Sequence, residues 1–213
     1  MDKPARSIEK KGRKRVIGSF MSAKMQEHVD WESQIERDFL YYLEFDADVK
    51  EYQAQPLRFK YTFNEKYHQH YPDYEIKRYS TPKRKFVEIK PFYITQKQDF
   101  IEKTIAIKAQ MDNDGYDYTV ITDKDIRVEP IYSNIKLLYR YITHEYDIDE
   151  VSSLITNLKA TNITTLSFEE LREVAKGFSL ALIDCYSCIA NNIFSFDINE
   201  PLSPMTILTL SQR

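Results

Sequence analysis

Glycine is scarce in this chain, with only 4 among 213 residues, and this scarcity excludes one class of site. Loops that cradle nucleotide phosphates need glycines, because the backbone N–H groups must come close to the phosphate oxygens. Neither Gly-x-x-x-x-Gly-Lys nor Gly-x-Gly-x-x-Gly occurs in the sequence. Nucleotide hydrolysis by such a loop is therefore excluded.

Long apolar runs are also missing. No stretch approaches twenty apolar residues, and the basic N-terminus is not followed by the apolar segment of a secretory signal. We therefore expect a soluble, cytoplasmic protein that makes no membrane contact.

The chain has only two cysteines, in the string Cys185-Tyr186-Ser187-Cys188. A closed zinc site needs four ligands, but there is no second cysteine pair and no histidine follows His144. Free cysteine is among the most buried residue types. We expect two core cysteines one helical turn apart, not a zinc or redox site.

Hydrophobic residues make up 42% of the chain and aromatic residues 14%, which indicates a folded protein with one sizeable core or two small ones. The formal net charge is -3, but it is unevenly distributed. Residues 131–213 contain six basic and ten acidic residues. This shift predicts a basic flexible arm over residues 1–25, a main domain over 26–130 and a second domain over 131–213.

Two short segments carry the strongest chemical signal: Tyr71-Pro72-Asp73-Tyr74-Glu75-Ile76 and Lys85-Phe86-Val87-Glu88-Ile89-Lys90-Pro91. Both segments are rich in residues that favour β-strands, and Ser80-Thr81-Pro82 between them is typical of a turn. We therefore expect a hairpin with a long loop. Side chains two apart on a strand share one face. Glu88 and Lys90 should project together, with Asp73 beside them on the neighbouring strand.

This arrangement suits metal-assisted phosphodiester hydrolysis. Mg²⁺ prefers oxygen ligands, which Asp73, Glu88 and the Ile89 carbonyl can supply; Mn²⁺ would also fit. Lys90 would orient or deprotonate a water, or stabilise charge on the phosphate. The alternative is an edge strand whose alternating Glu and Lys face solvent without chemistry. His68-Gln69-His70 is expected to be a loop histidine pair, with contact to phosphate or metal as its alternative.

The surrounding elements favour the catalytic interpretation. Ile35, Phe39, Leu40 and Leu43 recur at helical spacing after Asp30 or Ser33 as a cap, which places Glu36 at the edge of the buried stripe. Glu32 is a competing choice. Leu57 to Phe63 alternates as a half-buried strand, followed by a helix over residues 96–111 and an apolar strand over 116–122.

Two basic groups are candidates for contact with DNA phosphates. One lies in the N-terminal arm, where a solubilising tail is the alternative. The other lies in the loop between the two proposed catalytic strands, which we expect beside the cleft. The residues are Lys10, Lys11, Arg13, Lys14 and Arg15 in the arm, and Lys77, Arg78, Lys83, Arg84 and Lys85 in the loop.

In the C-terminal part we expect a connecting helix over residues 133–143, three helices over 148–158, 167–174 and 178–190, and a β-like wing over 191–210. Ser167 and Glu170 have the spacing of a capping box. Three helices and a wing indicate a winged-helix-like α+β domain. Its third helix carries no positive charge, so protein docking is the better interpretation than DNA reading.

Five strings in order resemble TnsA, the endonuclease family of heteromeric cut-and-paste transposases: Ser33-Gln34-Ile35-Glu36, Gln55-Pro56-Leu57, Pro72-Asp73-Tyr74, Val87-Glu88-Ile89-Lys90-Pro91 and Ile121-Thr122-Asp123-Lys124-Asp125-Ile126. The resemblance implies a restriction-endonuclease-like mixed sheet flanked by helices, with Glu36, Asp73, Glu88 and Lys90 as catalytic residues and Glu36, Asp73, Glu88 and the Ile89 carbonyl as metal ligands. Family members often have glutamine where this chain has Glu88, and a carboxylate there should strengthen metal binding.

The resemblance also implies a function. The chain would be a Mg²⁺-dependent endonuclease that cuts the 5′ strand at transposon ends in double-stranded DNA. A TnsB-like transposase would cut the 3′ strand, and a TnsC-like ATPase regulator would bind the C-terminal domain. Two alternatives remain open: a stand-alone restriction- or repair-type nuclease, and a non-catalytic assembly subunit.

Overall fold

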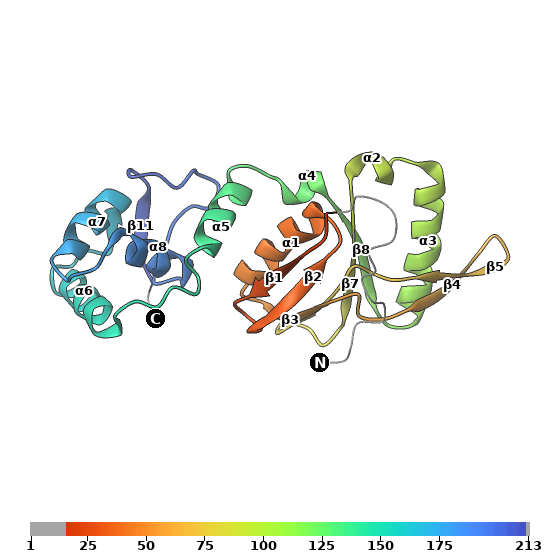
Figure 1. Ribbon diagram of the computed structural model, residues 1–213, viewed down its shortest axis with the longest axis horizontal. Coiled ribbons are helices and arrows are strands. Elements are labelled where there is room, and N and C mark those ends of the chain that lie inside the picture. Colours follow the sequence, from red (N-terminus) through yellow and green to blue (C-terminus); the bar gives the residue numbers. More distant parts are fainter. Residues whose placement is uncertain (1–15, 212–213) are drawn as a thin grey trace. The chain divides into compact units, whose positions relative to one another are not determined.

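The computed structural model describes residues 16–211, and the chain divides into two compact units, before and after residues 127/128. Figure 1 shows the elements of each unit. The basic residues at positions 10, 11, 13, 14 and 15 lie outside the described residues. Further along the predicted arm, Gly18–Ser22 forms strand β1, so the arm does not extend to residue 25 as a flexible segment.

The first unit is built on a four-stranded mixed sheet in the order β3-β6-β7-β8. Strands β3 (Val49–Ala54), β6 (Tyr74–Arg78) and β7 (Lys85–Lys90) are antiparallel neighbours, and β8 (Asp117–Thr122) runs parallel to β7. The parallel connection passes through the short helix α2 (Phe92–Thr95) and the long helix α3 (Gln98–Asn113). The predicted mixed sheet with flanking helices is confirmed, and it is consistent with a restriction-endonuclease-like fold.

Helices α1 (Gln34–Phe45) and α3 cover opposite faces of this sheet (Figure 1). Successive side chains of a strand point to opposite faces of the sheet, and this alternation decides which residues of β7 face α1 and which face α3. On the α1 side, Val87 and Ile89 of β7 are buried, and the rings of Phe39 and Tyr74 lie 5.9 Å apart. On the other side, Phe86 packs towards α3, so Glu88 and Lys90, which share its face, open on the α3 side.

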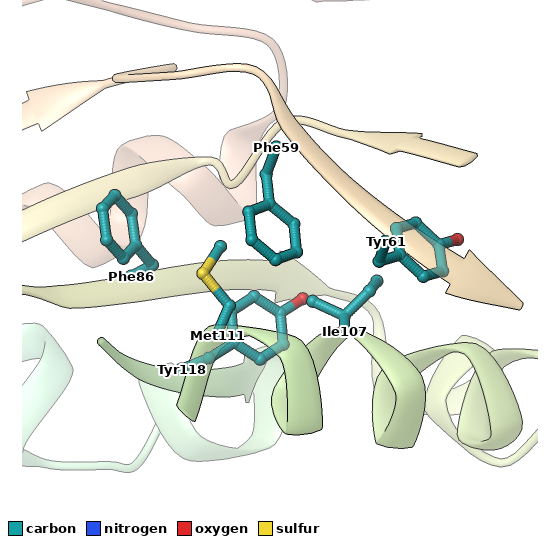
Figure 2. Packing of buried hydrophobic residues seen from close by; sticks show 6 residues of the cluster. All are labelled: Phe59, Tyr61, Phe86, Ile107, Met111 and Tyr118. Carbon is teal, nitrogen blue, oxygen red and sulfur yellow. The ribbon is translucent and has the colours of Figure 1, made fainter. Parts of the chain in front are cut away.

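A separate hairpin of β4 (Phe59–Phe63) and β5 (Lys66–His70) packs against α3. Figure 2 shows the contact: Phe59 and Tyr61 of β4 meet Ile107 and Met111 of α3, with Phe86 and Tyr118 completing the cluster. The predicted strand from Leu57 to Phe63 therefore exists from residue 59, but it pairs with β5 rather than with the main sheet. The neighbour of β6 is β3.

A second hairpin, β1 with β2 (Glu27–Trp31), lies against α1. Its turn is held by Glu44 of α1, whose buried carboxylate accepts hydrogen bonds from Ser22 Oγ at 2.7 Å, Ala23 N at 2.8 Å and Tyr52 Oη at 2.6 Å. A buried charge is stabilised when several donors satisfy its oxygens. Glu44 therefore fixes the hairpin to the helix that carries Glu36.

The short helix α4 (Asp123–Ile126) follows β8 and ends the first unit's regular structure. Arg127 donates from Nε to Asp38 Oδ2 at 2.9 Å, and Arg37 lies 2.6 Å from Asp38 Oδ1. Asp38 of α1 is 1% exposed, so two arginines neutralise its buried charge. This network attaches the end of the unit to α1.

The second unit holds four helices and a small antiparallel sheet. The helices are α5 (Ile131–Tyr139), α6 (Ile148–Ala160), α7 (Phe168–Lys176) and α8 (Leu182–Ala190), and the sheet order is β10 (Phe194–Ser195), β11 (Ile207–Leu210), β9 (Thr165–Ser167). The capping box of Ser167 and Glu170 at the start of α7 is confirmed. The winged-helix assignment stays a prediction.

Cys185 and Cys188 are free and buried in α8, as expected for core residues. Burial raises the pKa of their thiols to about 11 and about 12, so neither is a reactive thiolate at neutral pH. Within the described part of the chain, none of the helices combines the length and the apolar character needed to cross a membrane.

Candidate active site

Asp73, Glu88 and Lys90 meet where β6 begins and β7 ends. Asp73 immediately precedes β6, and its Oδ2 accepts a hydrogen bond of 2.6 Å from the backbone N–H of Ile89 in β7. Glu88 and Lys90 are the fourth and sixth residues of β7 and share one face. The structure thus brings together the three residues that sequence spacing predicted on two neighbouring strands.

The Lys90 ammonium lies between the two carboxylates. Its Nζ is 3.5 Å from Asp73 Oδ2 and 3.2 Å from the Ile89 carbonyl oxygen, and it forms an ion pair with Glu88 Oε1. Burial alone would lower the pKa of Lys90, but the charges of Asp73 and Glu88 outweigh it and raise this pKa above its usual value. Lys90 is therefore a permanent cation at neutral pH.

Glu36 joins the cluster from the first turn of α1. Both of its oxygens accept hydrogen bonds at 2.8 Å, from the backbone N–H of Glu32 and from Ser33 Oγ, while Ser33 Oγ accepts from Glu36 N at 3.2 Å. Ser33 is therefore the N-cap of α1, and of the two caps predicted from the sequence the structure has Ser33 rather than Asp30. Glu36 thus has a structural role in addition to its place near Asp73.

The acidic groups raise each other's pKa. Burial first, and then the charge of Asp73, raises the pKa of Glu36 to about 7. Burial, and then Glu88, raises the pKa of Asp73 to about 7, and burial also raises the pKa of Glu88. Three carboxyl groups close to one lysine form a site with an excess of negative charge that a divalent cation would relieve.

The donor set fits a hard cation. Glu88 is 6% exposed, and its Oε2 is buried without a hydrogen-bond partner in the described part of the chain. The available ligands near it are carboxylate and carbonyl oxygens, which suit Mg²⁺. Among residues 16–211, however, no three acidic, histidine or cysteine side chains already stand around one point as metal ligands. In this arrangement the Lys90 ammonium lies between the carboxylates instead.

Sequence reasoning placed His70 in a loop, but it ends strand β5 and lies at the site. Its Nε2 is 3.3 Å from Glu88 Oε2 and 3.2 Å from Tyr118 Oη. Burial, and then Lys90, lowers the His70 pKa to about 4, so the ring is neutral. His68 instead lies beside the rings of Tyr61 and Phe63. The two histidines share one face of β5, and only His70, at the end of the strand, reaches Glu88.

Gln55, the first residue of the string Gln55-Pro56-Leu57, links Asp73 to Glu32. Its backbone N–H donates to the Asp73 carbonyl at 2.9 Å, and its Nε2 donates to Glu32 Oε1 at 2.9 Å. Its φ of 45° is in the left-handed region, which is costly for a residue other than glycine. Glu32, the competing acid, is therefore held by Gln55, whereas Glu36 interacts with Asp73.

The basic loop after β6 lies away from this cluster. Asp73 precedes the start of β6 and Lys90 ends β7, so the loop of residues 79–84 joins the opposite ends of the two strands. The expected position beside the cleft is wrong, because a hairpin loop cannot adjoin both open ends of its strands. Four of the five basic residues predicted to contact DNA in and beside this loop are also paired within the domain: Lys77 with Glu51, Arg78 with Asp46 and Asp48, Arg84 with Glu75, and Lys85 with Asp117.

Residues 46–123 match the family described as the TnsA-like endonuclease N-terminal domain. The matched segment runs from β3 to the end of β8 and contains Asp73, Glu88 and Lys90, while Glu36 precedes it. No curated protein matches the chain. Over residues 46–123, which contain Asp73, Glu88 and Lys90, the chain is similar to the TnsA-like endonucleases.

Proposed function

We propose that this chain is the Mg²⁺-dependent endonuclease subunit of a heteromeric transposase and cuts the 5′ strand at transposon ends. The observation that carries the proposal is the meeting of Asp73, Glu88 and Lys90 within the TnsA-like endonuclease segment. An edge strand whose Glu and Lys face solvent would not place them there, because Glu88 is buried and β7 has a partner on each side.

Asp73, Glu88 and the Ile89 carbonyl would hold the ion, with Glu36 as a further acid at the edge of the site. A bound Mg²⁺ polarises a phosphoryl oxygen and lowers the pKa of a coordinated water. To admit the ion, the Lys90 ammonium would leave Glu88 and turn towards the phosphate. There it would stabilise the charge that develops on the phosphoryl oxygens, since it stays protonated.

The partners belong to the same proposal. A TnsB-like transposase would make the cut on the 3′ strand, and a TnsC-like ATPase would bind the second unit. The acidic balance of residues 131–213 and the absence of basic residues from α8 favour protein docking over DNA reading for that unit. The basic residues of the arm and of the β6–β7 loop remain candidate DNA contacts, with Lys83 the loop residue that makes no ion pair in the described part of the chain.

The test is cleavage of a plasmid carrying transposon ends by this chain together with its transposase and ATPase. The expected result is cleavage with Mg²⁺, none with a chelator, and a loss of at least about a hundredfold in Asp73→Asn, the size expected when several kcal/mol of charge stabilisation are removed. Asp99→Asn, an exposed acid on α3, is the matched control and should cleave normally. Normal cleavage by Asp73→Asn would contradict the proposal.

A further inference from the structure

The hairpin of β4 and β5 has one buried face and one exposed face. Phe59 and Tyr61 are buried against α3 (Figure 2), and the opposite face presents exposed side chains. In the hairpin register Lys60 lies opposite Gln69 and Thr62 opposite Tyr67, so these four form one continuous exposed surface, which we call the hairpin face. Tyr67 is 88% exposed.

The hairpin face is positive and polar. It carries the cation of Lys60 and no carboxylate, and Arg58, two residues before Lys60, is also exposed. Lys60 makes no ion pair within residues 16–211, unlike most of the charged side chains around the β6–β7 loop. Lys60, Tyr67, His68 and Gln69 line a hollow of about 310 Å³. The Lys60 ammonium, the Gln69 amide and the Tyr67 hydroxyl around this hollow suit contact with phosphate and sugar oxygens.

The base of the hairpin adjoins the candidate active site. Strand β5 ends at His70, whose Nε2 is 3.3 Å from Glu88 Oε2, and Asp73 follows three residues later. Five residues of strand extend about 17 Å, which equals about five base-pair steps of duplex DNA. The length of the hairpin therefore matches half a helical turn of a duplex whose phosphate reaches Asp73 and Glu88. His70 itself lies opposite Phe59, on the other face of the same ribbon.

We propose that the hairpin face, Lys60, Thr62, Tyr67 and Gln69, binds the duplex DNA that flanks the scissile phosphate. The proposal rests on the proposed endonuclease function for the choice of DNA as the partner. A two-stranded ribbon has the width to enter a major groove or to follow one backbone. Protein docking fits less well, because the hairpin face presents one exposed aromatic ring and no apolar patch.

The test is binding of a fluorescein-labelled duplex oligonucleotide to the full chain at low salt, measured by anisotropy. Lys60→Ala combined with Tyr67→Ala should weaken binding about tenfold or more, in line with the loss of one phosphate contact and one aromatic contact. In Lys60→Ala alone, the slope of log Kd against log salt should fall by about 1, whereas Tyr67→Ala should leave the slope unchanged. Both side chains are exposed, so the melting temperature should not change.

Lys108→Ala, an exposed lysine on α3, is the control for charge and should bind DNA as the wild type does. Unchanged affinity and salt slope in both hairpin variants, or no duplex binding by the wild type, would overturn the proposal. Variants that bind DNA normally but fail to cleave with the partner proteins would assign the hairpin face to a protein instead. Weakened binding in the variants, with no cleavage by the wild type under any condition, would contradict the endonuclease function and leave the DNA contact standing.

Discussion

The backbone N–H of Ile89 donates a 2.6 Å hydrogen bond to Asp73 Oδ2, so the aspartate before β6 is fixed to the strand that carries Glu88 and Lys90. The bond leaves the carboxylate in a defined orientation between two strands, and it brings Asp73 close enough to Glu88 for their charges to repel. Lys90 offsets that repulsion in the protein without metal.

Removing the Lys90 charge should destabilise the chain. Lys90→Met leaves Asp73 and Glu88 without their cation, and breaking such a partly buried pair is expected to cost about 1–3 kcal/mol in the free energy of unfolding, less than a fully buried pair because both acids can take up protons. Lys103→Met, which breaks the exposed pair with Asp99, should cost about 0.5 kcal/mol or less. Urea denaturation in chelator measures both. Equal costs for the two variants would show that Lys90 does not hold the carboxylates together.

The raised pKa values predict how stability depends on pH in the absence of metal. The pKa values of Asp73 and Glu36 rise from 3.8 and 4.5 to about 7 on folding, so the folded chain binds more protons than the unfolded chain between these limits. Their contribution therefore favours folding at low pH and is lost as the pH rises towards 7. In chelator, Asp73→Asn should be more stable than the wild type at pH 8, by about 1 kcal/mol or more, with a smaller difference at pH 5.

Thermal unfolding at the two pH values checks this, with Asp99→Asn as the control that should not change the profile. A wild-type advantage over Asp73→Asn at pH 8 would contradict the repulsion between the acids. The sign is opposite to that of a salt-bridged aspartate, whose stabilisation is lost on acidification.

Glu36 has two roles that mutation can separate. Glu36→Gln keeps one acceptor oxygen for the donors at the start of α1, so the free energy of unfolding should change by less than about 1 kcal/mol, while cleavage should fall at least about tenfold through loss of the charge. Ser33→Ala removes the cap itself and should cost about 1 kcal/mol while cleavage stays close to normal. Normal cleavage by Glu36→Gln would assign Glu36 only to the hydrogen bonds at the start of α1.

The sequence predicted the hairpin of β6 and β7 and a further strand at β8 because local patterns specify them. Asp73 stands before an apolar strand, Glu88 and Lys90 share a face by strand alternation, and α1 has both helical periodicity and its Ser33 cap. These features depend on neighbours close in sequence. The prediction of the site from Asp73, Glu88 and Lys90 therefore needed only one long-range assumption, that the two strands pair.

The rest depends on tertiary contacts. The side chains of strand β5 are mostly polar and exposed, so the sequence shows no alternation of apolar and polar residues there. The pairing of β4 with β5 could therefore not be predicted. The apolar residues Phe59 and Tyr61 correctly indicated a half-buried strand, but no pattern near them in the sequence indicated that they pack against α3. Because β5 was missed, His70 was placed in a loop although its strand carries it to Glu88.

The most direct test of the central claim is strand-resolved mapping of the transposon ends of a donor plasmid, in cells that express the transposase, the ATPase and either the wild-type chain or Lys90→Ala. The account predicts that Lys90→Ala loses the cut on the 5′ strand and keeps the cut on the 3′ strand. A 5′ cut that persists in Lys90→Ala, or the loss of both cuts, would contradict the assignment of Asp73, Glu88 and Lys90 as the nuclease site.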